Sequence, residues 1–184
     1  MPRLVFETER LAVRIATEED IELVYALWTS PDVMRHVGFP EGLRTTRREI
    51  ETQLSKADDS AFEQVLVVEL RDSGIAIGQA KLGWPDDEGI AEPDVKLLPR
   101  FWGHHYGAEA WRGLVDWQFT HTDCAAVHGT PNVDNVASIK MQEAAGAVRV
   151  GEGVFEFPES MRDYTVPVHY YTYRMSRADW EERQ

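Results

Sequence analysis

The stretch of sequence that decides the fold is Leu97-Leu98-Pro99-Arg100-Phe101-Trp102-Gly103-His104-His105-Tyr106-Gly107-Ala108-Glu109-Ala110. Its apolar start is typical of a strand end, and its two glycines predict a loop that opens a helix. Such a loop presents backbone N–H groups at the positive end of a helix dipole, and glycine lets the main chain approach a phosphate closely. The stretch therefore predicts an anion site, although glycines in a purely structural turn produce the same pattern.

A second informative stretch, residues 131–147, leads from a short strand into another helix. The helix is predicted over residues 135–145. Asn135 stands at its start, and Gly146 follows its last residue, which is typical of a helix C-terminus.

The flanking sequence predicts the other elements of a mixed α/β layout. Strands are predicted at residues 11–15, 63–70, 75–84, 90–98, 126–130, 148–157 and 168–176. Helices are predicted over residues 18–30, 46–56 and 108–119, with a short helical turn from residue 176. Pro31 is expected to end the first helix, and Pro93 suggests an edge or a bulge in the fourth strand. Residues 1–184 thus read as a single domain with a mixed, mostly antiparallel sheet of about seven strands and about four flanking helices.

Charge and composition exclude several classes of partner. The 184 residues include 19 Lys and Arg against 32 Asp and Glu, a net charge of −13, which disfavours nucleic acids and anionic membranes as primary partners. The surplus carboxylates favour an amine or a basic peptide as substrate, unless they only solvate the surface. A single cysteine, Cys124, excludes a disulfide within the chain and a zinc site of several cysteines, and its apolar neighbours indicate burial. Neither a signal-peptide pattern nor a membrane-spanning apolar run is present, so the cytoplasm is the expected compartment.

Together, the two informative stretches resemble the cofactor-binding core of the GNAT acetyltransferase superfamily. The opening Glu7-Thr8-Glu9-Arg10-Leu11-Ala12-Val13-Arg14 is similar to the first strand of the branch that includes the ribosomal-protein N-terminal acetyltransferases. The resemblance spans residues 7–175 and implies a single-domain GNAT-like fold. It also implies an N-acetyltransferase that moves an acetyl group from acetyl-CoA to a primary amine by direct attack in a ternary complex. A peptide N-terminus and a small-molecule amine both remain open as acceptors.

The resemblance also implies which residues bind the cofactor. In the family, the loop holds the CoA pyrophosphate through backbone amides, an amide of the preceding strand receives the thioester carbonyl, and the second helix lies near the pantetheine and the thiol. The matching loop positions are Arg100, Gly103, His104, His105, Tyr106, Gly107 and Ala108. The amide that binds the thioester carbonyl would be that of Leu97 or Leu98. The matching helix positions are Asn135, Ser138 and Lys140. Lys140 is equally well interpreted as a solvated side chain.

Two positions depart from the family pattern. His105 stands where the family usually has Gly or Ala, and Gln142 stands where it often has a tyrosine acid. His105 keeps its backbone N–H, so we expect cofactor binding to be retained. Gln142 cannot donate a proton, so Ser138 or a water would protonate the departing thiolate. The alternative is a catalytically degenerate module that keeps the fold and binds acyl-CoA or regulates a partner.

The attacking ammonium must lose a proton, and two carboxylates are candidates for the base. Glu92 and Asp94 stand two apart on a predicted strand and would share a face, where nearby acids raise each other's proton affinity. Glu92 matches the acidic position of the family motif. Alternatively, both are solvated acids beside a turn. Glu109 is expected to serve the helix dipole, and His104, His105 and Glu109 lack an evident further ligand, so no metal is expected.

The acceptor site is the least determined feature. In this architecture the first two helices and the last strand hairpin usually wall it. The aromatic and histidine candidates, each of which is otherwise a core residue, are Trp28, His36, Phe39, Trp84, Phe155 and Tyr170. The sequence leaves open whether the chain is a monomer or a homodimer.

Overall fold

The computed structural model describes residues 3–55, 60–62 and 64–183. The predicted helix end at Lys56 and the predicted strand start at Glu63 lie outside these ranges. The strands are β1 (Leu4–Glu7), β2 (Leu11–Ile15), β3 (Leu66–Leu70), β4 (Ala76–Lys81), β5 (Ile90–Ala91), β6 (Asp94–Leu97), β7 (Ala126–Gly129), β8 (Val148–Phe155) and β9 (Val168–Ser176). The helices are α1 (Ile21–Thr29), α2 (Pro31–Met34), α3 (Arg47–Leu54), α4 (Tyr106–His121), α5 (Val136–Ala145) and α6 (Arg177–Glu181).

The strands form two sheets rather than one. The first has the order β1-β2-β3-β4-β6 and is antiparallel throughout, and the second has the order β5-β7-β9-β8. The second sheet contains one parallel pair, β5 with β7. The mixed, mostly antiparallel α/β fold is therefore confirmed, and the described residues form nine strands instead of about seven.

Two features account for the additional strands. β1 carries no clear alternation of its own and is a strand because it pairs with β2. The predicted strand 90–98 is divided at Glu92 and Pro93 into β5 and β6, which belong to different sheets. Proline has no N–H to offer a ladder, and this is the physical reason for the break at that point.

Local capping signals set most helix starts. Thr46 and Glu49 form the predicted reciprocal capping box at the start of α3, and Gly146 ends α5 in a left-handed conformation. The prediction that Pro31 ends the first helix is wrong in detail. α1 ends at Thr29, and Pro31 is the first residue of α2, where a missing N–H costs no intrahelical bond.

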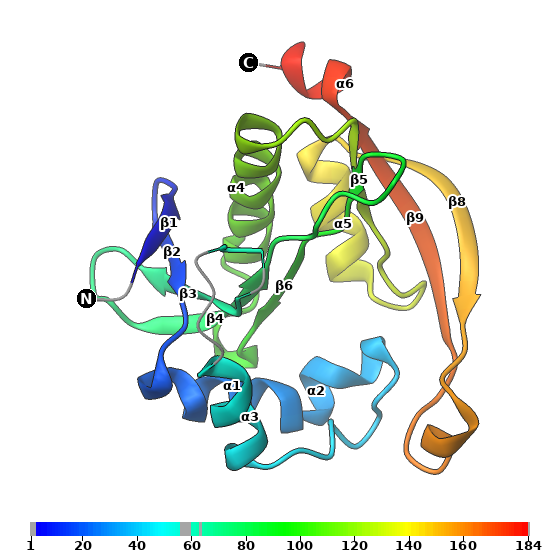
Figure 1. Ribbon diagram of the computed structural model, residues 1–184. Helices are drawn as coiled ribbons and strands as arrows, with labels where there is room; N and C mark the ends of the chain where they lie inside the picture. The colour runs from blue at the N-terminus through cyan, green and yellow to red at the C-terminus, as the bar shows by residue number, and fades with distance from the viewer. Residues whose placement is uncertain (1–2, 56–59, 63, 184) are drawn as a thin grey trace.

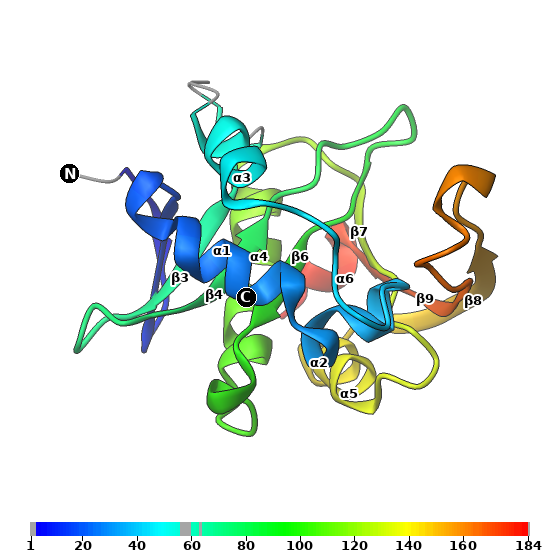
Figure 2. The same cartoon turned by 90° about the horizontal axis from the view of Figure 1, so that it is seen from below.

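Helices cover the first sheet on both faces (Figures 1 and 2). Leu114 of α4 packs in one core with Val13, Val68 and Leu97, which project from the same face of the sheet. On the other face, the α1 indole Nε1 of Trp28 donates to Gln79 Oε1 of β4 at 2.7 Å. α4 also covers the second sheet, where a further core includes the buried Cys124. No helix of the described residues is long and apolar enough to cross a membrane.

Candidate active site

The two sheets separate where β5 ends. β5 pairs with β7 only through Ile90 and Ala91, whereas β6 pairs with β4 from Asp94 onward. The chain crosses between the sheets at Glu92 and Pro93, and the backbone of Gly83 lies directly beside it. A Cβ on Gly83 would lie 2.7 Å from the Glu92 carbonyl oxygen. The ladder between β5 and β7 thus ends before β6 begins. The edge of β6 that faces away from β4 is not part of that ladder.

The hydrogen-bond register selects which amide of β6 faces that edge. Leu98 N donates to Ile77 O at 2.9 Å, so Leu98 is bonded to the β4 side. Because bonding alternates along an antiparallel pair, the N–H and C=O of Leu97 point away from β4. The Leu97 carbonyl accepts a hydrogen bond from Trp102 Nε1 at 2.8 Å. Of the two amides predicted to bind the thioester carbonyl, the Leu97 N–H points away from β4, whereas the Leu98 N–H is bonded to β4.

The glycine-bearing loop ends in an uncommon backbone conformation. After the single turn Pro99–Phe101, Gly103 has a φ of 80°, and His105, which caps α4, has φ 63° and ψ 11°. This left-handed conformation favours glycine, so the family's preference for a small residue at this position has a physical basis. Glu109 N donates to His105 O at 3.1 Å, and the N–H groups of Tyr106 and Gly107 precede that first intrahelical bond.

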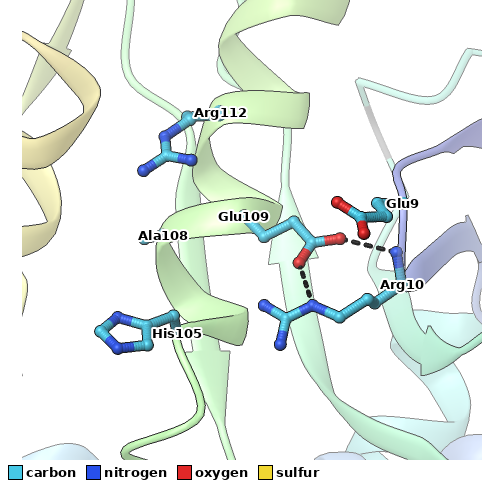
Figure 3. A pocket seen from close by; sticks show the side chains of 6 residues that line it. All are labelled: Glu9, Arg10, His105, Ala108, Glu109 and Arg112. Carbon is cyan, nitrogen blue, oxygen red and sulfur yellow. Dashed lines mark hydrogen bonds and ion pairs between the residues drawn. The ribbon is translucent and has the colours of Figure 1, made fainter.

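The first turn of α4 is bonded to the turn between β1 and β2 (Figure 3). Glu109 accepts hydrogen bonds from Thr8 Oγ1 at 2.6 Å and from the backbone N–H of Arg10 at 2.8 Å. Its other oxygen accepts from Arg10 Nε at 2.7 Å. Burial tends to raise the pKa of Glu109, but these bonds and the arginine charge outweigh it and hold the pKa below its usual value. Glu109 therefore binds a neighbouring turn in addition to facing the helix dipole.

A surface cavity of about 440 Å³ lies against this part of α4. In Figure 3, His105 and Arg112 lie on one side of the helix, and Arg10 and the Glu109 carboxylate lie on the other. The cavity is lined by Glu9, Arg10, His105, Ala108, Glu109 and Arg112.

The second helix contributes mainly through its N-terminus. Asn135 Oδ1 accepts from Ser138 N at 3.1 Å, so the asparagine predicted near the pantetheine caps α5. Ser138 is half-buried and Lys140 is exposed. Gln142 is 3% exposed, and its Oε1 has no hydrogen-bond partner among the described residues. It packs against Gly129 of β7, where an added Cβ would collide with its side chain.

Of the two candidate bases, Glu92 lies in the strand break and Asp94 is the first residue of β6, and they have different partners. Thr130 Oγ1 donates to the Glu92 carboxylate, and Asp94 forms an ion pair with Lys96. The predicted continuous strand is interrupted at Glu92 and Pro93, so the two acids do not lie on one regular strand. That the two carboxylates act as a pair stays a prediction.

His128 lies near Glu92 and is not among the residues predicted from the sequence. The parallel register of Ala91 with Val127, continued by one residue, sets His128 beside Glu92. Its Nε2 is buried and has no hydrogen-bond partner among the described residues. Burial and the nearby Arg174 lower the pKa of His128 against the opposing effect of Glu92 and two further acids, so its ring is neutral at pH 7. A lone histidine in an apolar strand gives no sequence signal for such a position.

Four of the six acceptor candidates gather at one end of the molecule. Asn132 Nδ2 donates to the carbonyl of His36 at 3.2 Å, and Asn132 also bridges to Tyr170. Phe157 connects Phe39 to Phe155 through ring contacts at 5.2 and 5.0 Å.

The other two candidates lie elsewhere. Trp28 is bonded to β4, and Trp84 stacks on Phe62 at 4.2 Å.

Of the residues considered for a metal, His104 stacks on Tyr106 at 5.5 Å. No group of three potential metal ligands occurs within residues 3–55, 60–62 and 64–183.

Comparisons with known proteins bear on the family and the fold. Residues 10–148 match the model of the acetyltransferase (GNAT) domain. An uncharacterized N-acetyltransferase, p20 from Bacillus licheniformis, is 24% identical over 138 residues, which are 73% of this chain and 76% of that protein. Spermidine N-acetyltransferase from Vibrio cholerae, in complex with CoA and spermine, has a TM-score of 0.77 at 20% identity and covers 95% of this chain and 99% of its own.

An aminoglycoside acetyltransferase in complex with coenzyme A has a TM-score of 0.70 at 19% identity and covers 95% of this chain and 99% of its own. At these identities the structural likeness concerns the fold, whereas the family model matches most of the chain. The chain belongs to the GNAT acetyltransferase family, whose members are acyltransferases that use acetyl-CoA.

Proposed function

We propose that this protein transfers the acetyl group of acetyl-CoA to a primary amine by direct attack in a ternary complex. The observation that carries the proposal is the strand break at Glu92 and Pro93, with the Leu97 N–H directed away from β4. A thioester carbonyl that accepts from this N–H would be polarised for attack, as in other acyl-transfer sites with fixed backbone donors. This geometry is what the transfer needs from the fold.

The phosphate end of acetyl-CoA fits the loop before α4. The amides of residues 103–108 surround the N-terminus of a 16-residue helix, where unpaired N–H groups and the dipole favour an anion. We assign pyrophosphate binding to Arg100, Gly103, His104, His105, Tyr106, Gly107 and Ala108. At α5, Asn135 keeps the helix N-terminus formed, and Ser138 and Lys140 remain candidates for the pantetheine and a phosphate.

We assign the amine end of the reaction to Glu92. Its carboxylate lies at the strand break, hydrogen-bonded to Thr130, and would take the ammonium proton directly or through one water. Asp86, Glu88 and Glu92 all lie near His128, although the nearby Arg174 opposes their charge there. The net charge of −13 supports a cationic acceptor. The relatives named for spermidine and for aminoglycosides also act on amines.

The departing thiolate needs a proton, for which we propose Ser138 or a water. Gln142 is an amide and is buried under β7, so it has no proton to give. The acceptor is a small-molecule amine or a peptide α-amine, and the opening residues 7–14 support kinship with the ribosomal-protein branch.

The test has two stages. Calorimetric titration with acetyl-CoA, with CoA for comparison, should give micromolar affinity, near −8 kcal/mol. An amine panel should then yield an acetylated product. Glu92→Gln should lower kcat by about 10²- to 10⁴-fold with little change in acetyl-CoA affinity. The matched control, Asp94→Asn, should keep most of the rate, because Asp94 is paired with Lys96.

The second candidate function is a catalytically degenerate module, which the His105 and Gln142 departures favour. It predicts acetyl-CoA affinity with no acetylated product from any amine in the panel. If Glu92→Gln were fully active, the proposed transferase function would stand, but Glu92 would not be its base.

A further inference from the structure

The turn between β1 and β2 contacts the phosphate-binding loop through one side chain. The guanidinium of Arg10 bonds Glu109 through Nε, and its Nη1 donates to the backbone carbonyl of His104 at 3.2 Å. The same group lies 4.6 Å from the ring centre of Tyr106. Arg10 therefore contacts both residues that flank His105. Figure 3 shows its bond to Glu109 in the first turn of α4.

The contact with the His104 carbonyl has a consequence for the next amide. The C=O of His104 and the N–H of His105 belong to one planar trans peptide group, so they point in opposite directions. Because Arg10 holds the His104 carbonyl toward the β1–β2 hairpin, the His105 N–H points away from that hairpin.

The loop needs such support, because its own conformation is unfavourable. His105 is the one residue other than glycine with a positive φ among those that the structure describes. A non-glycine residue in this region persists only when its surroundings hold it there. The contacts of Arg10 come from a segment 94 to 99 residues away in the sequence, so they do not depend on the loop's own preferences.

We propose that Arg10 is a positioning residue for acetyl-CoA. By holding the His104 carbonyl and the Glu109 carboxylate, it sets the orientation of the His105 amide before the cofactor binds. The inference rests on the proposed function, since it takes the loop as the pyrophosphate site. Arg10 acts through the backbone and through Glu109.

Arg71, which directly follows β3, offers a matched control. Its Nη1 donates to the carbonyls of Thr8 and Glu9, at 2.7 and 3.3 Å. Its Nε pairs with Glu7 at 3.3 Å. The side chains of Arg71 and Arg10 are 44% and 43% exposed. Both arginines thus bond the β1–β2 turn to its surroundings, but the partners of Arg71 lie in β1 and the turn, and those of Arg10 lie on the loop and α4.

The experiment compares wild type, Arg10→Gln, Arg10→Lys and Arg71→Gln. Calorimetric titration with acetyl-CoA should show about tenfold weaker binding for Arg10→Gln, which corresponds to about 1.4 kcal/mol. Arg10→Lys should be intermediate, because an ammonium keeps the charge without the planar fork. Arg71→Gln should bind as wild type does. With a saturating amine, Arg10→Gln should raise the KM for acetyl-CoA more than it lowers kcat.

Hydrogen exchange in the absence of any ligand supplies an independent readout. The amides of residues 104–109 should exchange about tenfold faster in Arg10→Gln than in Arg71→Gln. Unchanged exchange and affinity in Arg10→Gln, or equal losses in both glutamine variants, would overturn the proposal. A wild-type protein that fails to bind acetyl-CoA would instead overturn the proposed function, and that outcome is visible before any variant is made.

Discussion

Replacement of His105 by Gly and by Ala tests the backbone conformation of the phosphate-binding loop. Both variants lose the imidazole, so their difference isolates the Cβ at φ 63° and ψ 11°. A Cβ in the left-handed region costs about 1–2 kcal/mol. Glycine avoids this cost but loses about 0.4–1 kcal/mol through the greater freedom of the unfolded chain. We therefore expect His105→Gly to be more stable than His105→Ala by about 0.5–1 kcal/mol.

Thermal unfolding followed by circular dichroism measures this difference. For a domain of this size, 1 kcal/mol shifts Tm by about 2–4 °C, so the glycine variant should melt about 1–4 °C above the alanine variant. Both variants keep the amide at this position, and both should still bind acetyl-CoA. An alanine variant as stable as the glycine variant would refute the reasoning, because the left-handed backbone would then carry no cost.

Two further predictions concern the scaffold. Asp20 is 5% exposed and accepts two hydrogen bonds from Arg14, at 2.7 and 2.8 Å, so Asp20→Asn should lower the free energy of unfolding at pH 7 by about 3–5 kcal/mol. Burial tends to raise the pKa of Asp20, but the bonds from Arg14 and the Thr17 backbone lower it overall, so this stabilisation is present at neutral pH and is lost as the pH falls below about 4. In urea unfolding, the gap between wild type and variant should narrow at pH 3, and a constant gap would contradict the assignment. Gly83→Ala should cost about 1–3 kcal/mol and lower kcat, because the new Cβ would displace the backbone of Glu92. Its control is Gly151→Ala, where a Cβ has 3.9 Å to its nearest neighbour, and equal Tm values for these two glycine variants would show that the strand crossing tolerates the added carbon.

Much of the fold could be predicted from local patterns. The capping box of Thr46 and Glu49 and the C-cap at Gly146 were all correct, because each rests on bonds between residues a few positions apart. An irregularity at Pro93 was also predicted, as an edge or a bulge, since a missing N–H is a property of one residue. The separation into two sheets was not, because it depends on which partners β5 and β6 find.

The candidate site divides in the same way. The loop and the two glycine-flanked helices follow from the sequence, and the resemblance to the GNAT family named most of the proposed cofactor residues. The register that directs the Leu97 amide away from β4, and the position of His128 beside Glu92, follow only from strand pairing.

The sequence by itself determined the local structures and the family, because caps, turns and short motifs act over a few residues. Only the tertiary structure decided that Arg10 holds the loop 94 residues away and that Thr130 bonds Glu92 from 38 residues away. It also decided that the strand carrying Glu92 and Asp94 is interrupted and that His105 adopts a conformation suited to glycine. These features depend on strand register and on contacts between distant segments, and a residue's immediate neighbours in the chain do not specify either.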